Sequence, residues 1–350
     1  MTPPLPLEPT RFFHPVLPAR RLRQQPLRVL LAGTAYVLFR DAQGRPAALL
    51  DRCAHRFAPL SRGKRRTDGR LQCPYHGWHY GADGEGKCPS QPSLVRCTVP
   101  SFQLVERHGY LWLAGRAVPE SRLPDLALAG YEPAGTFDML FAAPLHVALD
   151  NFSEDEHTPW VHTRLGWNEA EAGAIRFEAH NFEDRTEVSY EAPQRAANGL
   201  ARLLLLRPGD TFQNRWVTRF DPVRTDYRVS WVSPVGRERP VCARAVIFMV
   251  PETTTTTRFH VFNFVRLAQP RLRFLLPLIR RVALGLAWWE IRDDARFIPT
   301  VAGTPFSFQG MRLDRYDKPL VHNHKLLERL YLGPAPAAPA TLPSKDTQAG

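Results

Sequence analysis

The chain has 350 residues, a length that suggests about two domains and allows a core that needs no disulfide bonds. Apolar residues make up 44% and aromatic residues 11% of the sequence, which excludes a disordered or fibrous protein. The net charge of +12 suits an acidic protein partner or an anionic substrate, and no basic arm or aromatic-basic repeat indicates nucleic-acid binding.

Two stretches of the sequence bear on export and membrane insertion, and neither carries such a signal. Residues 1–13 lack the apolar run of about 7–15 residues that a signal peptide needs. The most apolar stretch, residues 272–289, is interrupted by Arg273, Pro277 and Arg280, so it is too broken to span a bilayer. We therefore expect a soluble protein of the cytoplasm.

From residue 12 to about residue 115 the sequence alternates short apolar runs with turns. Asp and Gly mark strong turns at residues 41–44 and 82–86. This pattern predicts a small all-β domain over residues 1–117. Its strands are predicted at residues 29–32, 36–39, 47–50 and 110–113.

A connector with several prolines, residues 118–133, leads into a second region. One helix is predicted over residues 150–167, and a longer helix over residues 270–297. Strands followed by a long helix indicate an α+β domain with one antiparallel sheet, over residues 118–333. The tail, residues 334–350, is low in core-forming residues and is expected to be disordered. Strands of the sheet are predicted at residues 186–190, 211–219, 227–232, 243–250 and 254–265.

Two Cys–His pairs lie close together in the first region. Cys53 and His55 form a Cys-x-His motif, and after seventeen intervening residues Cys73 and His76 form a Cys-x-x-His motif. Two thiolates and two imidazoles could hold a tetrahedral zinc ion, but zinc fingers group Cys with Cys and His with His. The alternation found here suits a two-iron cluster, in which both thiolates bind one iron and both imidazoles bind the other. Zinc remains the alternative.

The residues around these pairs carry a family resemblance. The stretches DRCAHRFAPLSRG, which begins at Asp51, and CPYHGW, which begins at Cys73, closely resemble the Rieske [2Fe–2S] domain of oxygenases. The resemblance continues through residues 109–112 and so covers nearly the whole N-terminal segment. It implies that both Cys–His pairs bind a [2Fe–2S] cluster, whose two imidazole ligands raise its reduction potential.

A second metal-binding motif is predicted in residues 150–162, which read DNFSEDEHTPWVH. His157 and His162 lie five residues apart beside several carboxylates. On a regular helix they would be about 140° apart and would not share a face. Pro159 removes that objection if it interrupts the helix between them. Two imidazoles and one carboxylate form the facial triad of mononuclear non-haem Fe(II) oxygenases.

The carboxylate of this triad must come from elsewhere, and the stretch WWEIRDDARFI offers Asp293 and Asp294. With this stretch the whole chain resembles the Rieske non-haem iron oxygenases, specifically the short α-only group that includes vanillate O-demethylase. In that group two apolar residues follow three and four positions after the iron-binding Asp, which favours Asp294. The resemblance thus implies His157, His162 and Asp294 as iron ligands, and a helix-grip (START-like) catalytic domain.

The sequence departs from the family pattern beside the first histidine. Relatives usually carry an Asp three residues before that His, where it bridges to a cluster-binding His of the neighbouring subunit. Here Glu154 occupies that position and the Asp is displaced to Asp155. We expect Glu154 to form the bridge, with Asp155 as the alternative. Asn151 matches a family position near the iron, where its amide would donate a hydrogen bond.

The resemblance implies a terminal oxygenase that takes electrons from a separate reductase or ferredoxin. With dioxygen it would hydroxylate or oxidatively demethylate a small organic substrate, aromatic or cyclic. No G-x-G-x-x-G motif follows a strand, so no flavin or nicotinamide domain is evident. The two metals of one chain are expected to lie too far apart for rapid electron transfer, which implies a head-to-tail homotrimer.

Two further expectations remain open on the sequence alone. Trp288 and Trp289 are expected to pack in the core rather than to face the substrate. The alternative function is an electron-transfer or ligand-binding protein without oxygenase chemistry. Such a protein would hold two irons per chain, whereas the oxygenase would hold three.

Overall fold

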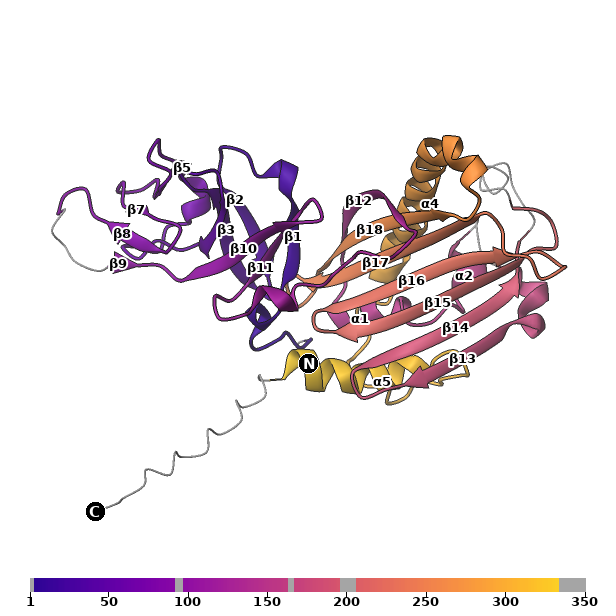
Figure 1. The fold of residues 1–350 in the computed structure, drawn as a ribbon. Helices are drawn as coiled ribbons and strands as arrows, with labels where there is room; N and C mark the ends of the chain where they lie inside the picture. The colour runs from indigo at the N-terminus through magenta and orange to yellow at the C-terminus, as the bar shows by residue number, and fades with distance from the viewer. Residues whose placement is uncertain (1–2, 92–96, 163–166, 196–205, 334–350) are drawn as a thin grey trace, which may run out of the picture.

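The computed structural model of the chain describes residues 3–91, 97–162, 167–195 and 206–333. These residues form two regions side by side, one built from short strands and one built on a large sheet (Figure 1). The predicted tail at residues 334–350 lies outside the described residues. None of the helices in the described ranges combines the length and apolar character that crossing a membrane requires.

The N-terminal region contains two antiparallel sheets. The first has six strands in the order β1-β11-β10-β4-β3-β2, and the second has five in the order β5 to β9. The six are β1 (His14–Pro18), β2 (Leu27–Leu31), β3 (Thr34–Arg40), β4 (Pro46–Leu50), β10 (Ser101–Arg107) and β11 (Tyr110–Ala114). The five are β5 (Lys64–Arg65), β6 (Leu71–Gln72), β7 (His79–Tyr80), β8 (Glu85–Lys87) and β9 (Cys97–Thr98). The strands of the second sheet are short, and the loops between them include the second Cys–His pair.

The second region is built on one seven-stranded antiparallel sheet in the order β12-β18-β17-β16-β15-β14-β13. Residues alternate between its two faces, so in β15 the buried Phe212, Asn214 and Trp216 share a face while Arg215 is exposed. The strands are β12 (Glu132–Phe141), β13 (Arg176–Asn181), β14 (Arg185–Pro193), β15 (Thr211–Phe220), β16 (Val223–Val232), β17 (Val241–Pro251) and β18 (Thr257–Leu267).

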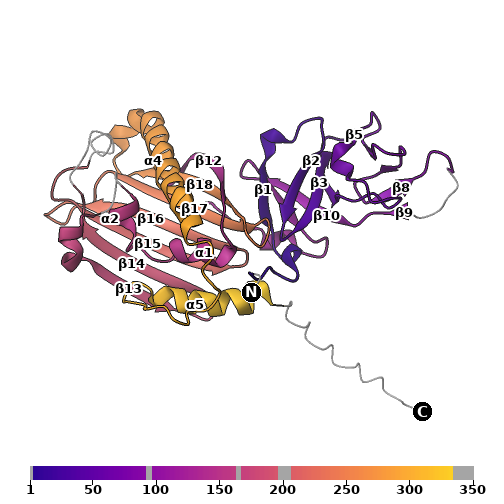
Figure 2. The same ribbon diagram turned by 180° about the vertical axis from the view of Figure 1, so that it is seen from behind.

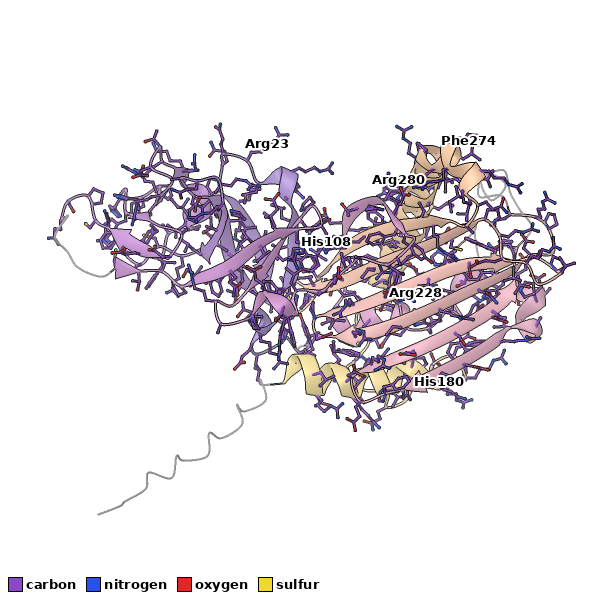
Figure 3. The ribbon with its side chains drawn as sticks, viewed as in Figure 1. Arg23, His108, His180, Arg228, Phe274 and Arg280 are labelled. Atoms are coloured by element: carbon purple, nitrogen blue, oxygen red, sulfur yellow. The ribbon has the colours of Figure 1, made fainter. Side chains whose placement is uncertain are left out.

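In the described part of the chain, helices cover one face of this sheet. Figure 2 shows them in front of the strands, and Figure 1 shows the opposite face without helices. On that open face Arg228 of β16 and His180 of β13 point into solvent (Figure 3). The α-helices are α1 (Leu145–Asn151), α2 (Thr158–Val161), α4 (Leu276–Phe297) and α5 (Lys318–Leu326). Short 3-10 turns occur at Pro9–Arg11, Ala19–Arg21, Leu60–Arg62, Glu120–Arg122, Glu169–Ala174, Pro270–Leu275 and Ile298–Thr300, and a π-helix at Leu327–Leu332.

A shared core joins the two regions. Strand β11 is buried along its whole length, and the ring of Trp112 packs on Phe248 and Phe262 of the large sheet. The backbone N–H of Ala32 donates to the carbonyl of Pro251 at 2.7 Å. Burial of aromatic side chains on both sides of this contact fixes the regions against each other.

The α+β architecture predicted from the sequence is confirmed, but the helix predicted over residues 150–167 is wrong. Helix α1 ends at Asn151, and α2 has only four residues. Pro159 lies in the first turn of α2, where a missing N–H does no harm, so it starts a helix instead of interrupting one. Strand β12, at the sheet edge against which α4 packs, was not predicted, and its first residues had been assigned to the connector.

The expected core packing of the paired tryptophans is also wrong. Trp288 and Trp289 are 37% and 38% exposed on the outer face of α4. The guanidinium of Arg292 lies over the Trp288 ring at 5.0 Å, one turn further along the same helix. The buried residues of this stretch are Ile291 and Asp294, so the side of α4 that carries them faces the sheet.

Candidate metal centres and active-site cavity

The two Cys–His pairs lie on two loops with the same backbone path. The N–H of Cys53 donates to the carbonyl of Ala58 at 2.9 Å, and the N–H of Cys73 donates to that of Trp78 at 2.7 Å. In each loop the residue just before the one whose carbonyl accepts this hydrogen bond has a left-handed backbone. These residues are Phe57, with φ 61°, and Gly77, with φ 73°. Each loop therefore presents its Cys and His residues from an equivalent turn.

Among these four residues the two imidazoles lie next to each other, and so do the two thiols. The rings of His55 and His76 lie with centroids 4.5 Å apart, and His55 stacks on Trp78. Burial, and then the adjacent Cys53, raise the pKa of the Cys73 thiol. Two neighbouring thiolates at this position therefore require a cation beside them.

The arrangement fits a two-iron cluster better than a zinc ion. In a tetrahedral zinc site all four ligand atoms crowd around one point. Among the described residues the group of three ligands that could hold a single metal ion is a different one and contains none of these four residues. The Nδ1 atom of His55 is buried without a hydrogen-bond partner, as expected for a nitrogen aimed at a metal. The hydroxyl of Tyr80 lies 3.1 Å from the Cys53 sulfur.

The group that satisfies the single-ion spacing is His157, His162 and Asp294. His157 immediately precedes α2 and His162 follows it in extended conformation, so the two imidazoles converge from opposite ends of a single turn. Their Nε2 atoms are 3.3 Å apart, and each lies 3.4 Å from Oδ1 of Asp294 on α4. Three lone-pair donors facing one another at this distance fit a divalent cation with open coordination positions.

Each imidazole has a carboxylate at its other nitrogen. His157 Nδ1 lies 2.5 Å from Glu154 Oε1, and His162 Nδ1 lies 3.1 Å from Glu290 Oε2. A carboxylate at Nδ1 holds the proton there and leaves the Nε2 lone pair free for a metal. Burial lowers the pKa of His157, but Glu154 and Asp294 outweigh it and leave that pKa well above its ordinary value. In the absence of a cation the site therefore attracts a proton.

The remaining predicted residues lie around this triad. Asn151 donates from Nδ2 to Oδ1 of Asp294 at 3.2 Å, so its amide orients the carboxylate. Asp293 lies outside the triad, with Arg296 3.8 Å away. Asp155 accepts a hydrogen bond from the Thr158 hydroxyl at 2.6 Å, and burial raises its pKa to about 6.

Two residues of this site were missed in the sequence. Glu290 lies one helical turn before Asp294, and the i, i+4 rule applied to α4 would have found it. Arg195, two residues after the end of β14, carries no local signal. Its guanidinium donates to the carbonyls of His162 at 2.8 Å, Pro159 at 3.3 Å and Trp167 at 2.8 Å.

A cavity of about 220 Å³ lies between the helix-covered face of the sheet and α4, and the triad lines it together with Asn151, Glu154 and Glu290. The hydroxyl of Tyr227 donates to the carbonyl of Phe152 and closes the cavity beside the triad. Its wall is mostly apolar, as in sites for small organic ligands. The aromatic side chains of the wall are those of Phe152, Phe212, Trp216, Tyr227 and Trp231.

Comparison with known proteins agrees with both sites. Residues 12–103 match the Rieske [2Fe-2S] domain. Over 304 residues the chain is 32% identical to the oxygenase component of chloroacetanilide N-alkylformylase from Rhizorhabdus wittichii, which covers 78% of this chain and 84% of that protein. The chain belongs to the Rieske non-haem iron oxygenases.

Two further members or neighbours of this family show how far the similarity reaches. Chlorophyllide a oxygenase of Chlamydomonas reinhardtii is 34% identical over 149 residues, which span 39% of this chain but only 22% of that protein. Dicamba monooxygenase bound to 3,6-dichlorosalicylic acid has the same fold, with a TM-score of 0.72 at 19% identity over 92% of this chain and 97% of that one. As a Rieske oxygenase the protein uses a [2Fe–2S] cluster and a mononuclear iron.

Proposed function

We propose that this Rieske oxygenase is the terminal component of a multicomponent system and hydroxylates or oxidatively demethylates a small aromatic or cyclic substrate. The observation that carries the proposal is the triad: three metal-ligand atoms meet at the wall of an aromatic cavity. An electron carrier needs no such cavity beside an incomplete coordination sphere. The relatives named for a chloroacetanilide and for dicamba support an aromatic substrate.

In this proposal His157, His162 and Asp294 hold the iron, which when bound supplies the activation of dioxygen. Glu154 would hold the Nδ1 proton of His157 through its hydrogen bond, and the charge of Glu290 beside Nδ1 of His162 would favour a proton there, so that both Nε2 lone pairs stay directed at the metal. The aromatic wall excludes water and holds the substrate ring against the triad.

The cluster ligands in this proposal are Cys53, His55, Cys73 and His76. The Tyr80 hydroxyl and the backbone of the two loops surround the thiolates, while the imidazoles lie nearer to solvent. Electrons from a separate reductase or ferredoxin would enter there, and the net charge of +12 suits an acidic donor.

A homotrimer is part of the proposal, because the cluster loops and α2 lie at distant ends of one chain in both views (Figures 1 and 2). Phe57 and Tyr75 beside the cluster loops are each 60% exposed, and Trp160 in α2 is 64% exposed. A head-to-tail ring would bury Phe57 and Tyr75 of one copy against the surface around Trp160 of a neighbouring copy. Glu154, which already holds His157, would then bridge to a cluster imidazole of that copy.

Iron content and single-turnover chemistry test the proposal together. The protein with both cofactors should contain three irons per chain. Reduced with dithionite and then given dioxygen, it should reoxidise its cluster faster when a methoxyarene substrate is present and should release formaldehyde. Two irons per chain, with a cluster whose oxidation ignores every aromatic compound tried, would favour the electron carrier instead.

A further inference from the structure

Two asparagine amides in the cavity wall have unsatisfied atoms. Asn263 of β18 and Asn214 of β15 are only 5% and 7% exposed, and both line the cavity. Nδ2 of Asn263 and Oδ1 of Asn214 have no hydrogen-bond partner among the described residues. Buried amide atoms without partners are costly, so each is expected to find a partner in what occupies the cavity.

The charged groups of the wall disfavour an anion in the same space. Among the described lining residues Arg244 is the only Lys or Arg, and like its strand partner Arg228 it points its side chain to the opposite face of the sheet. Its guanidinium is fully engaged, with Nε and one terminal nitrogen on Asp226 at 2.9 and 2.8 Å and the other on the carbonyl of Leu126 at 2.7 Å. The carboxylates of Glu154, Asp155, Glu290 and Asp294 line the other side. Iron at the triad would bring two positive charges, which the carboxylates of Asp294 and Glu154 would offset, so a carboxylate substrate would still meet the negative charge of Glu290 and Asp155.

The two asparagine amides lie at separate places in the cavity wall and do not form one contact site. In the sheet Asn263 lies opposite Ala245, which lies opposite Tyr227, and Asn214 lies opposite Val229 on the same strand as Tyr227. Three strand spacings and an offset of two residues along the strands separate the two asparagines, about 16 Å in all. Ala245, Tyr227 and Val229 lie between them on this face, and the small side chains of Ala245 and Val229 leave space for a planar ring beside the ring of Tyr227. Asn263 offers a donor at one flank, and Asn214 offers an acceptor oxygen that would repel an anion at the other.

We infer that the cavity selects an uncharged aromatic substrate whose carbonyl-type oxygen accepts a hydrogen bond from Asn263. The inference rests on the proposed function, because it treats this cavity as the substrate site. The inference goes beyond the proposed function because it names the electrical charge of the substrate and the residue that binds its oxygen, Asn263. A carboxamide, lactam or ester oxygen satisfies Asn263, whereas a carboxylate meets uncompensated negative charge.

Three probes that share a methoxybenzene ring and differ in the para group test the inference: 4-methoxybenzamide, 4-methoxybenzoate and 4-methylanisole. Calorimetric titration of the full chain with both cofactors should show the benzamide binding about 10-fold or more tighter than the benzoate. Asn263→Leu should weaken the benzamide roughly 3–10-fold and leave 4-methylanisole unchanged, since only the benzamide loses a hydrogen bond. Asn181→Leu, the same change at an exposed position of β13, is the matched control.

The outcomes separate this inference from the proposed function. Equal or tighter binding of the benzoate overturns the inference, and so does an Asn263→Leu variant that weakens the benzamide and 4-methylanisole alike. If the wild type releases formaldehyde from the benzoate but not from the benzamide, the oxygenase function stands and the inference fails. If the benzamide binds with the expected dependence on Asn263 but is never demethylated, the inference stands and the oxygenase function fails.

Discussion

The cluster loops and the triad hold their metal ligands in opposite ways. Phe57 and Tyr75 beside the cluster loops are each 60% exposed, whereas Asp294 in the triad is 4% exposed. The cluster loops come from one continuous stretch of 24 residues, Cys53 to His76. The triad joins two histidines to a carboxylate more than 130 residues further along the chain.

This difference matches what each centre has to do. Electrons can enter through a surface, so exposed loops stabilised by their own backbone hydrogen bonds suffice at the cluster. Dioxygen chemistry needs a space from which water is excluded, and such a space has to be enclosed by distant elements. The triad therefore depends on the packing of α4 against the sheet, and the cluster loops do not.

The largest expected effect comes from removing the distant ligand. Asp294→Ala should lower turnover by more than the roughly 100-fold that loss of an outer hydrogen bond costs, because two imidazoles alone leave the site incomplete. The cluster should keep its spectrum and remain reducible by dithionite, since its loops do not rely on α4. Turnover and the visible spectrum of the same preparation measure the two centres separately.

Asp293→Ala is the matched control, because it removes a carboxylate from the adjacent position of the same helix. It should retain activity, as Asp293 lies outside the triad. An inactive Asp293→Ala beside an active Asp294→Ala would show that the iron ligand is the neighbouring residue.

The contact between the two regions should be sensitive to acid. Burial lowers the pKa of His14 to about 4 and that of His260 to about 3, and both rings are enclosed where the regions meet. Both values lie below the ordinary 6.5, so the unfolded chain binds more protons than the folded one from pH 6.5 down to about pH 4. Stability is therefore fully present above pH 6.5 and falls by about 3 kcal/mol for each histidine by pH 4.

Replacing one of these histidines isolates its share of the acid sensitivity. His260→Phe keeps a ring beside Tyr110 and removes the titrating group. Urea unfolding at several pH values between 7 and 4 should show a flatter loss of stability than in the wild type. His180→Phe, on the exposed face of the sheet, should follow the wild-type curve. Identical pH slopes for His260→Phe and the wild type would contradict the assignment.

A smaller effect is expected where the two centres would meet across subunits. Glu154→Gln should leave both metal sites assembled but slow the dioxygen-driven oxidation of the cluster roughly 10–100-fold, because the charged partner of His157 is lost. Glu154→Asp should retain substantial activity, since it restores the residue common in the family. Stopped-flow absorbance of the reduced cluster measures the rate.

Asp155→Asn decides between the two neighbouring acids. Asp155 bonds the Thr158 hydroxyl at the start of α2 and not an imidazole, so its amide variant should oxidise its cluster nearly normally. A slow Asp155→Asn together with a normal Glu154→Gln would move the bridge by one residue.

How much of each centre was predictable follows from the distance between its parts. The four proposed cluster ligands and the two histidines of the triad could be predicted because spacing within a short stretch limits the chemistry. Asp294 was chosen over Asp293 by family resemblance, and Glu290 could have been found from the helical period. Arg195 could not be found, because it meets His162 only after β13 and β14 have returned the chain to α2. The helix predicted over residues 150–167 failed because proline can begin a helix as well as interrupt one.

Arg195 gives the last and smallest prediction. Its guanidinium holds the carbonyls on both sides of His162, so it positions an iron ligand without touching the metal site itself. Arg195→Met should lower iron affinity by about 10-fold, at the low end of the loss seen when outer hydrogen bonds to ligands are removed. Iron retained after dialysis against a weak chelator measures it, with the cluster spectrum as the internal reference.

Two companion variants show whether geometry or charge is responsible. Arg228→Met removes the same charge from the exposed face of the sheet and should retain iron like the wild type. Arg195→Lys keeps the charge but cannot reach several carbonyls at once, because an ammonium lacks the planar fork of a guanidinium. It should therefore lose iron nearly as readily as Arg195→Met. If Arg195→Lys instead behaves like the wild type, the positive charge acts on the triad from a distance, and the backbone around His162 needs no clamp.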